Sequence, residues 1–208
     1  MKLYHTQMTP SSRKVRIFLQ EKRLEIPMED VAEGFALAGW YRQQYPHAVV
    51  PMLELDDRTQ LGEALAICRY FEECQPDPPL MGVGARDKAV VDMWERRAYL
   101  EGAGAVEEVF RNSHPLMVNR GLAGTDEPVP QIPVLIERGK RRLHRFYEKF
   151  DQQLAGSRFV AGDRFSIADI TTLCAVDFGI ACQLDIPESS VHVRRWHAEI
   201  STRPSAAA

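Results

Sequence analysis

The chain has 208 residues, enough for one large domain or two small ones with a buried core. Hydrophobic residues make up 45% and charged residues 26%, which is ordinary for a globular protein and excludes a disordered chain. The formal net charge of −3 gives no electrostatic reason to expect a nucleic-acid partner.

The lengths of the apolar runs and the spacing of the cysteines indicate where in the cell the protein is found and whether its thiols are reduced. No apolar run approaches the ~20 residues that a membrane-spanning helix requires. Residues 1–5 lack the apolar stretch of a signal peptide. Four cysteines form no CxxC pair and have no metal-ligand spacing with the histidines: Cys68, Cys74, Cys174 and Cys182. We therefore expect a cytoplasmic protein with reduced thiols, no metal site and no membrane partner.

Up to residue 76, short apolar runs alternate with helical patterns. Short apolar, strand-like runs predict strands at residues 2–4, 26–31, 52–55 and 60–61. Spacings of three and four between apolar residues predict helices at residues 11–22, 35–44 and 64–74. This order implies a small mixed sheet with helices on its faces.

Proline and glycine interrupt the pattern near residues 75–84, and the chain beyond them has helical period throughout. Helices are predicted at residues 87–110, 132–154 and 192–202, and a loop at residues 112–130. We place a first domain at residues 1–76, a linker at 77–85 and an all-helical domain at 86–208.

The segment Phe165-Ser166-Ile167-Ala168-Asp169-Ile170 predicts a capping box at a helix start. The Ser166 hydroxyl can accept a backbone N–H of the first turn, while the Asp169 carboxylate reaches back to the Ser166 N–H. Residues 170–180 carry no charge except Asp177, so the helix is expected to be mostly buried.

The first segment that suggests chemistry is Thr9-Pro10-Ser11-Ser12, which comes after a predicted strand and opens a helix. Hydroxyls and open backbone N–H groups at the positive end of a helix dipole can hold an anion, including a thiolate. The alternative is that Ser11 or Ser12 only caps the helix and Pro10 only sets its entry.

Two further segments could contact a ligand. A proline at the start of a strand belongs at an edge or in a special turn, and a cis Val50–Pro51 bond would leave the Val50 backbone free to pair with an extended peptide. Glu63 lies at the start of the next helix. The helix dipole alone favours an acid there, but Glu63 could also bind the ammonium of a ligand.

Five motifs together resemble the cytosolic glutathione transferase superfamily, in its bacterial type with a TPS motif: LYxxxxTPSSRKVRIFL, VVPMLEL, LGEALAICRYFEE, FSIADI and RRWHAEISTRP. The resemblance covers essentially the whole chain. It implies an α+β thioredoxin-like N-terminal domain followed by an all-α C-terminal bundle. It also implies a homodimeric glutathione transferase that joins glutathione to a small electrophile, or uses it to reduce a peroxide or disulfide, without a metal or other cofactor.

The resemblance assigns roles residue by residue. Thr9 matches the position that contacts the glutathione sulfur, with Ser11 as the nearest substitute and Ser12 or Tyr4 behind it. Pro51 matches the cis proline, Val50 would pair its backbone with the cysteinyl unit, and Glu63 would contact the γ-glutamyl group. The resemblance also places the electrophile between the domains, with five candidate contacts: Met8, Trp94, Arg97, Tyr99 and His114.

The glutathione site departs from the family pattern. Ala64 replaces the serine that grips the γ-glutamyl carboxylate, and Val49 replaces a lysine or glutamine that holds the glycine carboxylate. Two lost bonds to charged groups, at ~1.5–3 kcal/mol each, would weaken binding ~150-fold or more. Tyr45-Pro46 also replaces the usual Asn-Pro. Four side chains could compensate: Arg13, Arg42, His47 and Arg69. A non-catalytic binding or regulatory module with weak or no glutathione affinity is therefore the alternative function.

Overall fold

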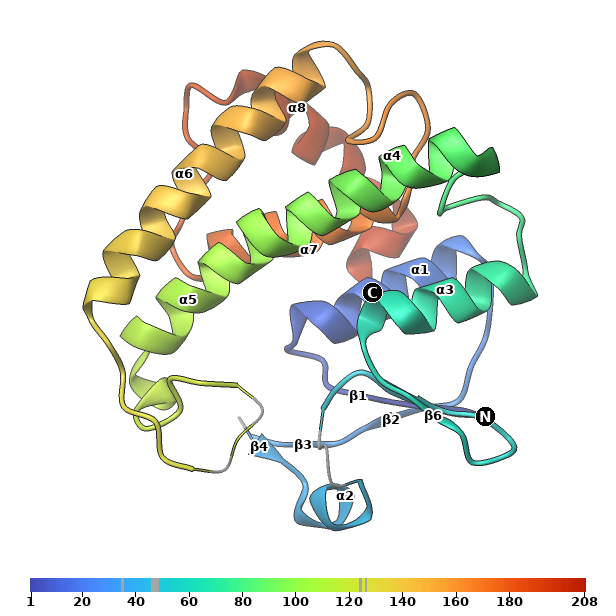
Figure 1. The fold of residues 1–208 in the computed structure, drawn as a ribbon, viewed down its shortest axis with the longest axis vertical. Helices are drawn as coiled ribbons and strands as arrows, with labels where there is room; N and C mark the ends of the chain where they lie inside the picture. Colours follow the sequence, from blue (N-terminus) through green and yellow to red (C-terminus); the bar gives the residue numbers. More distant parts are fainter. Residues whose placement is uncertain (35, 46–48, 124, 126) are drawn as a thin grey trace. The chain divides into compact units, whose positions relative to one another are not determined.

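The computed structural model describes residues 1–34, 36–45, 49–123, 125 and 127–208. It contains two compact units, residues 1–78 together with 207–208 and residues 79–206 (Figure 1). The division falls within the proline- and glycine-rich stretch between the sheet-containing and helical parts of the sequence. Each unit has its own architecture.

A four-stranded mixed sheet is the centre of the first unit, with strand order β2-β1-β5-β6. The strands are β1 (Lys2–His5), β2 (Met28–Asp30), β5 (Met52–Glu54) and β6 (Gln60–Leu61). Strand β1 runs parallel to β2 and antiparallel to β5, and β5 pairs antiparallel with β6. Leu3 and Leu53 face each other in the register and are fully buried, so the core begins at these central strands.

Two helices pack together over this sheet, α1 (Pro10–Glu21) and α3 (Ala64–Cys74) (Figure 1). Their apolar residues recur every three or four positions, so each helix has one buried stripe. Phe18 of α1 and Ile67 of α3 are both fully buried. The predicted strands and these two helices are therefore confirmed, with shifts of one or two residues at their ends.

The segment between β2 and β5 differs from the prediction of a helix over residues 35–44. Its described residues form a two-stranded hairpin of β3 (Ala32–Glu33) and β4 (Ala36–Leu37), and α2 (Gly39–Gln44) begins only at Gly39. The Ala38 N–H donates to the Val31 carbonyl at 2.9 Å, which closes the chain into a hairpin before the helix can start. Residue 35 lies outside the described residues.

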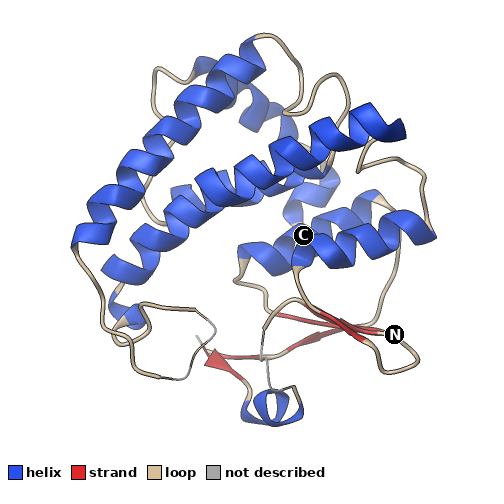
Figure 2. Cartoon of the chain, viewed as in Figure 1, coloured by secondary structure: helices blue, strands red, loops and turns tan. Residues whose placement is uncertain are grey.

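The second unit consists of helices joined by loops (Figure 2). The predicted helix at 87–110 is a longer element formed by α4 (Gly84–Arg97), a π-helical segment η1 (Ala98–Ala103) and α5 (Gly104–Ser113). Gly102 in the π segment lies against the ring of Phe146, and a Cβ atom there would lie 2.8 Å from that ring. A glycine is therefore required for this helix to pack closely on its neighbour.

The remaining helices complete the second unit: η2 (Pro115–Met117), α6 (Val134–Ala155), α7 (Ile167–Ala181), α8 (Val191–Ile200) and η3 (Pro204–Ala207). Helix α7 contacts α4, η1, α5 and α8, and its residues from Ile167 to Val176 are all buried. It is the central helix, as its lack of charge predicted. In the part of the chain that the structure describes, no helix is both long and apolar enough to cross a bilayer.

Candidate functional site

Sheet register brings the three segments that the sequence predicts to contact a ligand to one end of the sheet. Tyr4 pairs with Met52, so the loop after β1 and the residues before β5 leave the sheet at the same end. Leu53 pairs with Leu61, so the residues after β6 leave there too. A Cβ placed on Gly62 would lie 3.7 Å from the Val49 side chain, which confirms that these two segments are adjacent.

The start of α1 is open toward a ligand. Thr9 is the N-cap residue, with an extended backbone (φ −87°, ψ 131°), and its side chain makes no capping hydrogen bond. Pro10 occupies the first helical position, and the first turn contains no acidic residue. The N–H groups of the first turn therefore face the helix terminus with no carboxylate of their own turn to neutralise them.

Three hydroxyls are linked around this helix start. The Thr6 hydroxyl donates to Thr9 Oγ1 at 3.0 Å, and the Thr9 hydroxyl donates to Ser12 Oγ at 2.8 Å. Ser12 Oγ also accepts the Thr6 backbone N–H at 3.3 Å. Thr9 is half-buried and Ser12 is 0% exposed, so of these two only Thr9 can meet a ligand. Sequence reasoning overlooked Thr6, which has no motif of its own.

A buried arginine holds the same loop in place by hydrogen bonds to its backbone. The Arg16 guanidinium donates to the carbonyls of Thr6 at 3.0 Å and Gln7 at 3.2 Å, and it lies 3.3 Å from His5 Nδ1. Burial lowers the pKa of His5, and the Arg16 charge lowers it further, so the imidazole stays neutral and can accept. Sequence reasoning missed Arg16. The signal was a cation within the apolar helix segment VRIFL.

The Val50–Pro51 peptide bond is cis, the geometry that the sequence left open. Pro51 is buried and Met52 begins β5, while Val49 is 39% exposed. The Tyr41 hydroxyl donates to the Val49 carbonyl at 2.7 Å. Burial raises the pKa of Tyr41, so the phenol keeps its proton and remains a donor. Tyr41, on α2, is therefore a second residue that holds this end of the sheet in place by a hydrogen bond, and the sequence did not indicate it.

Glu63 is the N-cap residue of α3 rather than part of its first turn. Its side chain is exposed and makes no capping bond, and its backbone has a φ of +60°. Such a conformation costs a non-glycine residue of order 1 kcal/mol, and strained residues of this kind concentrate at functional sites. Ala64 is the first residue of the helix, so a ligand carboxylate there would meet backbone N–H groups only.

The proposed compensating cations lie on three helices of the first unit: Arg13 on α1, Arg42 on α2 and Arg69 on α3. His47 and Pro46 lie outside the described residues. Met8, on the loop after β1, is 61% exposed.

The other electrophile candidates are spread along one long helical element. The Arg97 guanidinium lies 4.9 Å from the ring of Trp94, so these two residues are close together. His114 comes directly after the end of α5, where its ring lies beside Phe110 and its Nδ1 accepts the Leu116 N–H. A rise of ~1.5 Å per residue separates Trp94 from His114 by roughly 25–30 Å. The structure therefore does not gather Trp94 and His114 into one small pocket within this unit.

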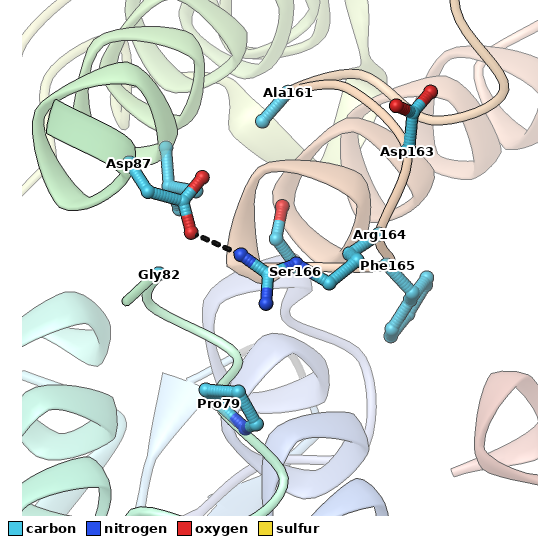
Figure 3. Close-up of a pocket in the computed structure, with 9 residues that line it drawn as sticks. Pro79, Gly82, Asp87, Ala161, Asp163, Arg164, Phe165 and Ser166 are labelled. Carbon is cyan, nitrogen blue, oxygen red and sulfur yellow. Dashed lines mark hydrogen bonds and ion pairs between the residues drawn. The ribbon is translucent and has the colours of Figure 1, made fainter. Parts of the chain in front are cut away.

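A small cavity lies in the second unit, beside the start of α7 (Figure 3). Its volume of about 30 Å³ is enough for one water molecule but not for a tripeptide. Arg164 and Asp87 form an ion pair across it, and Asp87 also accepts the Val83 N–H. These contacts hold the loop ahead of α4 to the loop ahead of α7, so the cavity is structural. Among the described residues, no three metal-ligating side chains cluster together.

Comparisons with known proteins agree with this architecture. Residues 3–79 match the model of the glutathione S-transferase N-terminal domain, and residues 130–204 match that of the C-terminal domain. Glutathione S-transferase 2 of Saccharomyces cerevisiae is 31% identical over 209 residues, covering 99% of this chain and 87% of the relative. The chain belongs to the glutathione S-transferase family, with its thioredoxin-like first domain and helical second domain.

Among solved structures, two bacterial members of the family are similar to this chain in sequence and fold. A Gtt2-class glutathione S-transferase of Vibrio parahaemolyticus is 32% identical, with a TM-score of 0.81 and coverage of 99% of this chain and 94% of that one. A glutathione S-transferase domain-containing protein of Marinobacter aquaeolei is 32% identical, with a TM-score of 0.87 and 99% coverage of both chains. The chain is thus similar to Gtt2-class and other bacterial members of the family.

Proposed function

We propose that this protein binds glutathione as a thiolate and either conjugates it to a small electrophile or uses it to reduce one. The observation that carries the proposal is the common end of the sheet, where the open start of α1, the cis Val50–Pro51 segment and Glu63 lie together. An extended peptide thiol needs these three features: a thiolate site, a backbone edge and an ammonium acceptor.

Thiol activation falls to Thr9 and the α1 terminus, with Ser11 as the substitute contact. A free cysteine thiol has a pKa of ~8.5, and lowering it by two units requires roughly 2.7 kcal/mol of preferential thiolate stabilisation. One hydroxyl donor and a helix N-terminus together can contribute that much. The thiolate is itself the nucleophile, so the chemistry proceeds without a metal or flavin.

The rest of the peptide would lie along the other two segments. The Val50 backbone pairs with the cysteinyl unit, Glu63 accepts the ammonium, and the N–H groups from Ala64 onward receive the neighbouring carboxylate. The exposed Val49 offers the glycine carboxylate no charge partner. Glutathione is therefore expected to bind more weakly than in relatives that keep both polar contacts.

The second candidate function is a non-catalytic binding module, and the same two positions favour it. Ala64 and Val49 each remove a polar contact to the tripeptide, and their combined cost could leave millimolar affinity. A module of this kind would keep the fold without useful turnover.

Titration calorimetry with glutathione, followed by an aryl-halide conjugation assay, separates the two functions. Binding with turnover supports the enzyme, and binding without turnover on any electrophile tested supports the module. No heat and no protection against melting at millimolar glutathione would refute the enzyme and favour a module without glutathione affinity.

We further propose a cytoplasmic homodimer in which Met8, Trp94, Arg97, Tyr99 and His114 contribute to electrophile binding, not all in one pocket. Light scattering should give twice the chain mass of 23.6 kDa. A single-chain mass at micromolar concentration would contradict the dimer. Substitution of Arg97 or His114 by alanine should change the KM for the electrophile more than the KM for glutathione.

A further inference from the structure

The hydroxyls of Thr6, Thr9 and Ser12 form a short hydrogen-bonded chain. A hydroxyl has one proton to donate and two lone pairs that accept. Ser12 Oγ accepts both the Thr6 N–H at 3.3 Å and the Thr9 hydroxyl at 2.8 Å. Thr9 Oγ1 accepts the Thr6 hydroxyl at 3.0 Å. In this arrangement the Thr9 proton points inward, away from the side on which a ligand would bind.

We propose that Ser12 is a positioning residue that turns the Thr9 proton toward the bound sulfur. When a thiolate lies beside Thr9, the bond between Thr9 and Ser12 reverses, so that Ser12 donates to Thr9 Oγ1 and Thr9 donates to the sulfur. The inference rests on the proposed function. No proton is transferred and no covalent bond changes, because each hydroxyl only rotates.

The donor and acceptor count favours this reversal. With the thiolate bound, Thr9 Oγ1 accepts from Thr6 and from Ser12 and donates once, which uses its full capacity. Ser12 Oγ still accepts the Thr6 N–H, so the chain of donors begins at a backbone group that cannot rotate. Hydrogen bonds in such a chain polarise one another, which makes the Thr9 proton a better donor to the anion.

The surroundings fix this geometry before any ligand binds. Ser12 is 0% exposed and lies on α1, so it acts through Thr9 and not on the sulfur directly. The Arg16 guanidinium holds the Thr6 carbonyl at 3.0 Å and therefore fixes the peptide that comes after β1. The oxygens of the chain are thus kept within bonding distance by the fold.

A double-mutant cycle with Ser12→Ala and Thr9→Ala tests the inference. The readout is the pKa of the glutathione thiol bound to each variant, followed by the ultraviolet absorbance of the thiolate during a pH titration. Ser12→Ala should raise this pKa by about half a unit to one unit, and Thr9→Ala by more. In the Thr9→Ala background, Ser12→Ala should have no further effect, because Ser12 acts through Thr9.

Ser157→Ala is the matched control. Ser157 lies in the second unit, and its hydroxyl lies within hydrogen-bonding distance of two carbonyl oxygens, those of Phe159 at 2.8 Å and Gln153 at 3.0 Å, and donates its one proton to one of them. This variant also loses a bonded hydroxyl, but the pKa of the bound thiol should remain that of the parent.

The outcomes separate the inference from the proposed function. If the parent protein binds glutathione but Ser12→Ala leaves the thiol pKa unchanged, the positioning role is overturned. Equal shifts from Ser12→Ala with and without Thr9 would also overturn it. If the parent protein does not bind glutathione, the proposed function is refuted, and the positioning role of Ser12 is refuted as well because it depends on that function.

Discussion

The starts of α1 and α7 use similar residues in opposite ways. At α7, Ser166 and Asp169 form a capping box in which the carboxylate accepts the Ser166 N–H at 3.0 Å and the serine hydroxyl accepts the Ala168 N–H at 3.3 Å. At α1, the N-cap Thr9 makes no capping bond and bonds sideways to Thr6 and Ser12. One helix start satisfies its own backbone, and the other keeps its backbone donors available.

The two helix starts also differ in burial, since the start of α7 is buried and the start of α1 is partly exposed. Asp169 is fully buried and also accepts the Val160 N–H and the Trp196 indole N–H, both at 2.9 Å. Thr9 is half-buried, and Pro10 and Ser11 beside it are half-buried too. We therefore expect the α7 start to contribute mainly to stability and, under the proposed function, the α1 start to contribute mainly to binding. Three tests probe this division and a fourth probes the Tyr41 contact at the same end of the sheet as the α1 start, in decreasing order of expected effect.

The largest effect is expected for Asp169→Ala. The substitution leaves the N–H groups of Val160, Ser166 and Trp196 buried without an acceptor, which should lower the free energy of unfolding by about 3–5 kcal/mol. Urea denaturation measures it. Asp163→Ala, an exposed acid on the loop just before the box, is the control and should stay within about 0.5 kcal/mol of the parent. Equal stabilities for the two variants would contradict a structural role for the box.

Acidification should reveal the burial of the same carboxyl. Burial raises the pKa of Asp169 to about 6 despite four hydrogen-bond donors. A carboxyl whose pKa is higher in the folded state stabilises the fold fully below pH ~4, and this contribution is lost as the pH rises through about 6. A shift of about two units corresponds to about 3 kcal/mol.

Asp169→Asn provides the reference for that titration, because its side chain does not titrate. The free energy of unfolding of the parent minus that of Asp169→Asn should fall by about 3 kcal/mol between pH 4 and pH 7. Urea denaturation at several pH values measures it. A difference that stays flat or rises with pH would mean that the carboxyl is already ionised at pH 4.

Thr9→Ala tests the other helix start. We expect kcat/KM for conjugation near neutral pH to fall about 10- to 30-fold, because the thiolate loses one hydrogen bond to a hydroxyl, which corresponds to about 1.5–2 kcal/mol. The free energy of unfolding should fall by about 1–2 kcal/mol, less than for Asp169→Ala, because the hydroxyl bonds to Thr6 and Ser12 are lost but no capping bond is. Parent-like turnover would transfer the sulfur contact to Ser11 or to the helix terminus alone.

The smallest effect is expected for Tyr41→Phe. The variant removes the bond from the Tyr41 hydroxyl to the Val49 carbonyl and should cost about 1 kcal/mol of unfolding free energy. If the bond also positions the Val50 backbone, the glutathione dissociation constant should rise a few-fold by calorimetry. Tyr70→Phe, on α3, is the matched control because Tyr70 lies outside the buried cluster that contains Tyr41, which consists of Tyr4, Val31, Ala38, Tyr41, Tyr45 and Met52. A variant that loses stability but keeps its affinity would restrict Tyr41 to the core.

The sequence alone determined the features that depend on neighbours within about four residues. The capping box at Ser166 and Asp169 and the stripes of α1 and α3 follow from local hydrogen bonds and helical period. At the start of α1, the sequence left two interpretations open, an anion site or a simple cap, and the structure showed that Thr9 makes no capping bond. The order of strands and helices fixed the fold class, and five motifs carried the resemblance to the family.

Tertiary structure alone decided what joins distant residues. Arg16 meets the Thr6 carbonyl ten residues away, Tyr41 meets Val49 eight residues away, and Trp196 reaches Asp169 across 27 residues. The hairpin that replaced the predicted helix at 35–44 depends on the bond from Ala38 to Val31. Local propensity cannot anticipate such contacts, because they form only once the packed core has brought their partners together.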